Sequence, residues 1–394
     1  MSPSDERIPL AEPSIGGNAS RYLEECLATN FVSSVGPFVS RFEEAFAAFV
    51  GSRHAVACAS GTAAIHLALR ALDIAADDDV LVPTLTFVAS ANPVRYEGAT
   101  VVLVDSEDAS LGMDPTLVAD ELARRERHSL PMPAAIEVVH LVGHPADLEP
   151  ILDLAERNGI PVVEDAAEAL GATWTSGRLA GRQVGSVGRV GCFSFNGNKI
   201  ITTGGGGMLV TDDDAIAGRA RHLSTQARLP GRAYAHDEIG YNYRLSNVSA
   251  ALGLAQLEQL PDLLARRRAV AGRYDEALAH VPEMRSARRA SWADPTFWLY
   301  TAGVASGEEH DREALLDGLA QRGIEARPIW TPLHLQPLYS DAPRIRGDVA
   351  ERVFREAVSL PSSSSLGAAQ QDRVIDGVRQ LVSKRAPVPS GGSD

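Results

Sequence analysis

"FSFNGNKIITTGGGGMLV", residues 193–210, places one lysine between an aromatic, strand-like segment and four consecutive glycines. Three interpretations of Lys199 are open: a solvated turn residue, a phosphate anchor, or a covalent catalyst. The stretch is not a P-loop, because in that motif the lysine follows the glycines. Nor do its glycines form the G-x-G-x-x-G pattern that follows the first strand of a dinucleotide-binding fold. The neighbouring sequence has to decide between the three.

From about residue 51 to residue 210, short apolar segments alternate with helical patterns. In "GTAAIHLALRAL" the apolar residues fall on one helical face. This alternation predicts an α/β domain with a largely parallel sheet and helices on both faces. The segments that predict buried strands are "HAVACAS", "DVLVP", "TVVLVD", "AIEVVHLVG" and "IPVVED".

After about residue 247 a long helical stretch begins, in which "ARRRAV" is interpreted as a solvated helix face. It leads to a more mixed region with a strand in "TFWLYTAGVA" and a helix in "REALLDGLAQRGI". We therefore predict a large domain over residues 1–255, a smaller α+β domain over residues 256–385, and a disordered tail over residues 386–394.

Composition narrows the function classes. The net charge of −14 argues against a nucleic-acid partner, since phosphate backbones require a basic face. No apolar run is long enough to cross a bilayer, and the N-terminus has no apolar signal core, so a cytoplasmic protein without membrane contact is expected. Three widely spaced cysteines suggest neither disulfides nor zinc, and no metal site is predicted.

Two further motifs could carry chemistry. Ser60, Gly61 and Thr62 stand at a strand-to-helix junction, where free N–H groups and hydroxyls suit a phosphate, although the motif taken alone favours a capped helix start. Asp165 follows an apolar strand, where ligand sites of open α/β sheets collect. Its alternative interpretation is a helix cap.

Taken together, these residues suit pyridoxal 5′-phosphate (PLP). Its chemistry needs a Schiff-base lysine, an acid at the pyridinium nitrogen and a phosphate cup. The cup (Ser60 to Thr62), the acid (Asp165), a hydroxyl (Ser194) and the lysine (Lys199) occur in workable order along the chain. The presence of all four features in one chain is much harder to explain by coincidence than the presence of any one of them.

The sequence resembles the DegT/DnrJ/StrS family, the fold-type-I, PLP-dependent aminotransferases that act on nucleotide-linked keto sugars. The resemblance spans nearly the whole chain. Its blocks include "NFVSSVGPFVSRFEEAF", "SGTAAIHLAL", "PTLTFVASANPV", "VEDAAEALGA", "FSFNGNKIITTGGGGM", "GYNYRLSN" and "GIEARPIWTPLHLQPLY".

The resemblance implies roles for single residues. Lys199 corresponds to the lysine that binds the cofactor and Asp165 to the pyridinium partner. Phe87 matches the aromatic that stacks on the pyridine ring. Asn242 matches an asparagine that reaches the phosphate from a second subunit, which implies a homodimer with shared active sites. The other implied positions are Ser60, Gly61, Thr62, Glu168 and Ser194 for the cofactor, and Asn30, Ser33, Arg327 and His334 for the substrate.

Two departures refine the expected substrate. Gly205 stands where the family commonly has Glu, and Glu168 stands where many members have Gln. Both resemble the subgroup that aminates C4 of UDP-linked 4-keto-6-deoxy-N-acetylhexosamines, the bacillosamine and legionaminic acid type, with L-glutamate as the expected amino donor. The alternative within the family is a GDP-perosamine or dTDP-amino sugar type of substrate.

Two alternatives from other classes are disfavoured. A PLP-free regulatory protein would have no need of Lys199. In PLP-dependent sugar dehydratases, which resemble this chain, the lysine is replaced by histidine.

Overall fold

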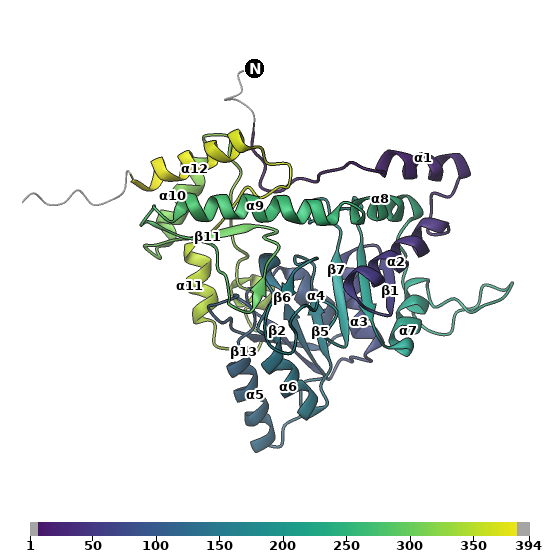
Figure 1. Cartoon of the computed structure of the whole chain (residues 1–394). Coiled ribbons are helices and arrows are strands. Elements are labelled where there is room, and N and C mark those ends of the chain that lie inside the picture. Colours follow the sequence, from purple (N-terminus) through teal and green to yellow (C-terminus); the bar gives the residue numbers. More distant parts are fainter. Residues whose placement is uncertain (1–6, 384–394) are drawn as a thin grey trace, which may run out of the picture.

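A computed structural model describes residues 7–383 of the chain (Figure 1), so the tail predicted for residues 386–394 lies outside the described residues. Its largest sheet has eight strands in the order β1-β8-β7-β5-β4-β2-β3-β13. Neighbouring strands are parallel, except that β8 runs antiparallel to β1 and β7. The strands are β1 (His54–Cys58), β2 (Asp79–Pro83), β3 (Thr100–Val104), β4 (Ala135–Val139), β5 (Val162–Asp165), β7 (Val190–Ser194), β8 (Gly207–Thr211) and β13 (Arg344–Ile345).

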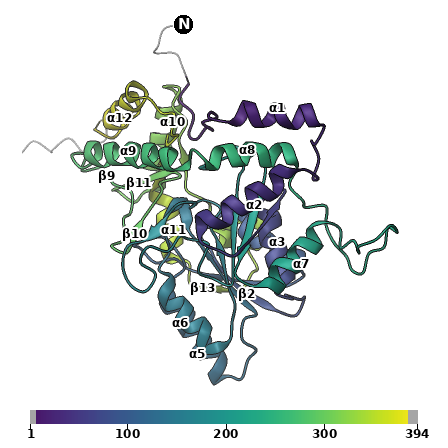
Figure 2. The ribbon, with the colours of Figure 1, turned by 45° about the vertical axis from the view of Figure 1, so that its right-hand side comes forward.

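Helices cover both faces of this sheet (Figure 2), as the alternating sequence predicts. One face packs against α3 (Gly61–Ala71), α4 (Val88–Tyr96) and α7 (Asp214–Ser224). The other packs against α2 (Pro37–Val50), α5 (Pro115–Arg127), α6 (Leu148–Asn158) and α8 (Asn247–Leu257), with α1 (Ala19–Thr29) lying on α8. The predicted α/β fold class is confirmed, and none of the helices within residues 7–383 is long and apolar enough to cross a membrane.

The C-terminal region forms a second layer with its own core. It has a four-stranded sheet in the order β12-β14-β11-β9, packed against α9 (Leu260–Leu278), α10 (Glu309–Ala320) and α12 (Ala368–Ser383), with α11 (Asp348–Glu356) nearby. The strands are β9 (Met284–Arg285), β11 (Tyr300–Val304), β12 (Arg327–Pro328) and β14 (Ala357–Leu360). A separate short ladder joins β6 (Thr173–Trp174) to β10 (Ala293–Asp294).

Two segments cross the boundary predicted between residues 255 and 256. The division into two domains at that point stays a prediction. Ile8 is fully buried in the C-terminal core, and its N–H donates to the Gly323 carbonyl at 2.9 Å. In the opposite direction, β13 leaves the C-terminal region and pairs with β3 at the edge of the large sheet. The two layers are therefore connected twice: the N-terminal segment with Ile8 packs in the C-terminal core, and β13 of the C-terminal region pairs with the large sheet.

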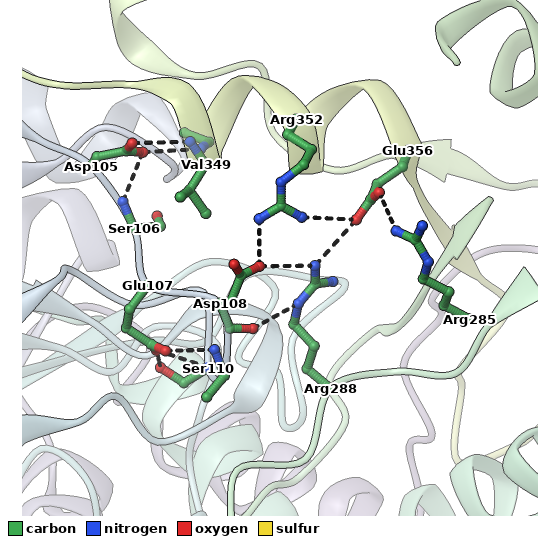
Figure 3. Close-up of polar contacts among 12 residues, drawn as sticks. Asp105, Ser106, Glu107, Asp108, Ser110, Arg285, Arg288, Val349, Arg352 and Glu356 are labelled. Carbon is green, nitrogen blue, oxygen red and sulfur yellow. Dashed lines mark hydrogen bonds and ion pairs between the residues drawn. The ribbon is translucent and has the colours of Figure 1, made fainter. Parts of the chain in front are cut away.

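A polar network also joins the layers (Figure 3). Asp108, in the loop after β3, accepts from Arg352 Nη2 at 2.6 Å and lies 3.7 Å from Arg288 Nη2. Both arginines also pair with the buried Glu356, which is bound by Arg285 as well. The hydrogen bond from Arg352 holds the pKa of Asp108 below its usual value. Asp105 adds a backbone link, because its carboxylate accepts from the first free N–H groups of α11.

Candidate active site

A cavity of about 310 Å³ opens where the parallel strands end. This is the edge at which open α/β sheets bind their ligands. Its walls come from segments that follow β1, β2, β5 and β7, together with two tryptophans of the C-terminal region. The lining includes Ser60, Gly61, Thr62, Phe87, Asp165, Glu168, Ser194, Asn198, Lys199, Gly205, Trp298 and Trp330. The structure thus brings together eight of the nine predicted cofactor residues.

The predicted phosphate cup lies at the start of α3. Ser60 is the N-cap, and its Oγ accepts from Ala63 N at 3.0 Å, so the capping interpretation holds while the residue also lines the cavity. Gly61 has to be glycine, because a Cβ there would lie 2.8 Å from Ser194 Cβ. The N-terminus of a helix with hydroxyls around it attracts a phosphate.

Asp165 lies at the end of β5 with a carboxylate held by two donors. Ser90 Oγ donates to Oδ2 at 2.7 Å, and the N–H of Ala167 donates to Oδ1 at 3.0 Å. Ser90 is fixed in turn by Thr86, whose hydroxyl lies 2.8 Å away. Asp165 is only 5% exposed, so its charge acts inside the cavity instead of in solvent.

Lys199 follows a tight turn after β7, in which its N–H donates to the Asn196 carbonyl at 3.0 Å. Its side chain lines the cavity, and Nζ lies 3.6 Å from Glu168 Oε1. The lysine and the acid that PLP chemistry requires therefore face one space. Of the three interpretations of Lys199, the solvated turn residue is wrong, because the side chain is only 13% exposed.

Glu168 is held on three sides. The N–H of Val142 donates to Oε2 at 2.7 Å, and Trp330 Nε1 donates to Oε1 at 3.2 Å, on the same oxygen that faces Lys199. Burial raises the pKa of Glu168, and the Lys199 charge opposes that shift. Val142 reaches this position with φ +50°, which is costly for a β-branched residue and is found where function fixes the backbone.

Phe87 is 47% exposed at the mouth of the cavity, and its ring centroid lies 4.9 Å from that of Trp330. This is consistent with the predicted stacking role. Trp330, Trp298, Asn198 and Ser90 also line the cavity, although the sequence did not single them out. The two tryptophans could not be found from the local pattern, because they come from more than ninety residues further along the chain than Lys199.

The remaining predicted residues lie elsewhere. Asn242 is exposed and lies outside the cavity lining, where its Oδ1 accepts from Gln226 at 3.0 Å. Asn30 and Ser33 are exposed on the segment between α1 and α2. Arg327 lines a second cavity of about 280 Å³ that shares Asn198, Trp298 and Trp330 with the first.

His334 is buried and lines neither of these two cavities. Its Nδ1 lies 2.6 Å from Thr84 Oγ1 and its Nε2 lies 3.1 Å from Glu351. Both ring nitrogens thus have protein partners, so its role toward substrate stays a prediction.

The chemistry of the cavity fits PLP. A helix N-terminus with Ser60, Thr62 and Ser194 suits the phosphate, the buried Asp165 carboxylate suits a protonated ring nitrogen, and Lys199 supplies an amine within the same cavity. The match of this chain to the DegT/DnrJ/EryC1/StrS aminotransferase family extends over residues 13–379.

The chain belongs to this family.

Relatives agree with the assignment. EpsN of Bacillus subtilis (strain 168) is 42% identical over 376 residues, which are 94% of this chain and 95% of that protein. A GDP-perosamine synthase of Caulobacter vibrioides is 41% identical over 377 residues, 95% of this chain and 98% of that enzyme. The crystal structure of the aminotransferase TlmJ from Streptoalloteichus hindustanus has a TM-score of 0.87 at 29% identity, covering 96% of this chain and 99% of that one.

The chain is thus a PLP-dependent nucleotide-sugar aminotransferase of the DegT/DnrJ/EryC1/StrS family. When bound, PLP supplies an aldehyde carbon that bonds to amines and a ring that accepts the electron pair of a broken C–H bond. Lys199 would provide the amine that holds the cofactor and, when an amino donor takes its place, would be the base that moves the proton. Asp165 would keep a proton on the ring nitrogen, and the cup at the start of α3 would hold the phosphate.

In this family member an unusual acid lies close to Asp165. Glu137 in β4 is fully buried, and within residues 7–383 neither of its carboxyl oxygens has a hydrogen-bond partner. Burial, and secondarily the charge of Asp165, raises the pKa of Glu137 well above its usual value. A carboxyl that stays protonated when folded but ionises near pH 4.5 when unfolded makes folding take up a proton. Stability should therefore fall as the pH rises above that value.

Glu137→Gln is expected to raise the free energy of unfolding by on the order of 1–3 kcal/mol at pH 7.5, and by less at pH 5. Urea unfolding at the two pH values measures this difference. Glu164, a buried acid on the neighbouring strand, is the matched control, because it accepts from His140 at 3.0 Å and from the N–H groups of Gly185, Val187 and Gly188. Glu164→Gln should destabilise, and an equal effect of both substitutions would contradict the account.

Proposed function

We propose that this enzyme transfers the amino group of L-glutamate to C4 of a UDP-linked 4-keto-6-deoxy-N-acetylhexosamine, in the synthesis of bacterial glycan precursors. The observation that carries the proposal is that both subgroup residues, Glu168 and Gly205, line the cavity together with Lys199. Gly205 is exposed at the cavity, and a Cβ placed on it would meet nothing within 4 Å. Where a glutamate is common, this chain therefore offers open, uncharged space to a substrate.

A second candidate is the amination of a GDP-linked keto sugar of the perosamine type. The similarity to the Caulobacter vibrioides GDP-perosamine synthase, at 41% identity, favours it. Both candidates share the same chemistry at C4 and differ in the nucleotide and in the substituent at C2 of the sugar.

We further propose that the second cavity, with Arg327, takes part of the nucleotide sugar. Support comes from the residues that it shares with the first cavity. A nucleotide sugar extends well beyond its keto carbon, so the part of it that does not react needs space next to the first cavity. Asn30, Ser33 and His334 remain proposed substrate residues on the sequence resemblance alone.

The proposed active form is a homodimer with shared sites, acting in the cytoplasm. Asn242, the residue proposed to reach a neighbouring phosphate, lies outside the cavity of its own chain. The segment that carries Asn30 and Ser33 exposes apolar side chains, with Phe31 at 45%, Val32 at 45% and Val35 at 68%. A second copy covering this segment would remove their apolar surface from water.

A single-turnover experiment separates the candidates. The enzyme loaded with PLP is mixed with UDP-4-amino-4,6-dideoxy-N-acetylglucosamine, and conversion of the cofactor to its amine form is followed by absorbance. We expect conversion at least about tenfold faster than with GDP-perosamine or a dTDP-4-amino sugar, which is a difference of about 1.4 kcal/mol. Faster conversion by GDP-perosamine would establish the second candidate, and no conversion by any of the three would contradict both.

A further inference from the structure

The amine of Lys199 lies over the face of an indole ring. Its Nζ is 3.9 Å from the centroid of the Trp298 ring. A cation at this distance is attracted by the negative face of an aromatic ring, and tryptophan binds cations best among the aromatic side chains. Trp298 is only 1% exposed and the Lys199 side chain only 13%, so the contact is largely shielded from bulk water.

The Trp298 ring is itself fixed. Its Nε1 donates to the carbonyl of Asn198, the residue before Lys199, at 2.7 Å. Its backbone carbonyl accepts from the buried Arg267 at 3.0 Å, and its ring lies 6.3 Å from that of Trp330 at an interplanar angle of 25°. The ring therefore cannot turn away from Lys199 without breaking a hydrogen bond to the lysine's own turn.

A carboxylate supplies the second contact with the same amine. Glu168 Oε1 lies 3.6 Å from Lys199 Nζ, and Glu168 is anchored through Val142 and Trp330. Trp330 therefore contributes to both contacts, as a donor to the carboxylate and as a stacking partner of the Trp298 ring.

The backbone around Trp298 is shaped for this placement. Phe297, the preceding residue, has φ +50°, which is unusual for an aromatic residue. The chain passes so close to Gly143 that a Cβ there would lie 2.8 Å from Trp298 N and 2.5 Å from Thr296 Oγ1. Both features hold a segment of the C-terminal region against the loop that carries Val142.

We infer that Trp298 is a positioning residue for Lys199, and that its indole ring and the Glu168 carboxylate form a clamp on the free ammonium of the lysine. In transamination the lysine takes a proton from one carbon atom and returns it to another, so it carries the proton as an ammonium ion between the two transfers. The clamp stabilises the lysine in that interval and keeps it within the cavity. Because Trp298 belongs to the C-terminal region, the catalytic lysine is held by both layers of the molecule.

The composition of the chain permits a direct test. Lys199 and Lys384 are the only two lysines of the sequence, so an amine-directed reagent has, apart from the α-amino group, one site of interest and one internal reference. The cofactor-free full-length protein is treated with an N-hydroxysuccinimide ester of acetate, and peptide mass spectrometry gives the ratio of labelling at Lys199 to that at Lys384. Acylation needs the amine to turn its lone pair toward the reagent, so an amine held between the indole face and the Glu168 carboxylate should be labelled slowly.

Trp298→Leu is expected to raise this ratio about tenfold, whereas Trp298→Phe, which keeps an aromatic face, should raise it less than about threefold. Trp298→Leu should also lower kcat about tenfold with KM for the amino donor nearly unchanged. Trp292→Leu is the matched control, since Trp292 is a partly buried tryptophan outside the cavity lining, and it should change neither quantity.

An unchanged labelling ratio in a folded Trp298→Leu variant overturns the clamp, and so does an equal rise in Trp298→Phe, which would indicate lost packing. Should Trp298→Leu fail to fold, Glu168→Gln tests the opposite contact with little change in shape. The clamp predicts a higher ratio there as well, and an unchanged ratio overturns it.

Discussion

Lys199→Ala is expected to abolish transamination, with a loss of at least about 10⁴-fold, because it removes both the covalent attachment of the cofactor and the base that moves the proton. The fold should survive, since the side chain makes one ion pair, to Glu168, and Glu168 keeps its donors from Val142 and Trp330. Absorbance of the bound cofactor measures the lost attachment, and coupled assays of glutamate turnover measure the rate.

Added methylamine provides a control, because a small amine in the cavity restores a base without restoring the tether. Partial recovery with methylamine is expected, whereas turnover near that of the wild type without it would contradict the assignment.

The same variant tests the proposed dimer: mixed and refolded with Asn242→Ala, it should regain activity, since one of the two sites in a mixed dimer with shared sites is intact.

Asp165→Asn is the second large effect. Asparagine keeps the shape and one acceptor oxygen, but it loses the negative charge that holds a proton on the ring nitrogen. We expect PLP to bind and attach to Lys199, and proton transfer to slow by about 10²- to 10⁴-fold. Stopped-flow absorbance after mixing with L-glutamate measures the first half of the reaction alone.

Ser90→Ala is the matched control for that substitution. It removes one of the two hydrogen bonds to Asp165, at 2.7 Å, and leaves the charge in place. A loss of about tenfold or less is expected. If Asp165→Asn slowed the half-reaction no more than Ser90→Ala does, Asp165 would be a structural cap.

Much of this arrangement follows from patterns that are local in sequence. The strand segments coincide with β1 to β5, and the helical pattern "GTAAIHLALRAL" is α3. Lys199, Asp165 and the cup could be predicted because each lies at the end of a strand or in the segment that follows it. In a parallel sheet, the residues after successive strands meet at one edge.

What the sequence could not provide depends on contacts between distant segments. Arg267 belongs to the predicted solvated face but is 1% exposed, and its guanidinium donates to the carbonyls of Trp298 and Ser362. That prediction is wrong for Arg267, because the segments that carry Trp298 and Ser362, next to β11 and β14, cover this side of α9. The long helix expected from Asn247 is interrupted before α9, where Pro261 in the first turn lacks the N–H needed to continue α8.

The strand β13 has a consequence for how the protein is made. The ribosome releases β3 some 240 residues before Arg344 and Ile345, so for most of synthesis the backbone of β3 has an unpaired edge. Such edges recruit other chains, and slowly completed parallel sheets are prone to aggregate during folding. The eight-stranded sheet is complete only after the C-terminal region has been synthesised and Arg344 and Ile345 of β13 have paired with β3. A truncation that removes β13 would therefore leave the edge of β3 unpaired and prone to aggregation, even though β7 and the turn that carries Lys199 are complete.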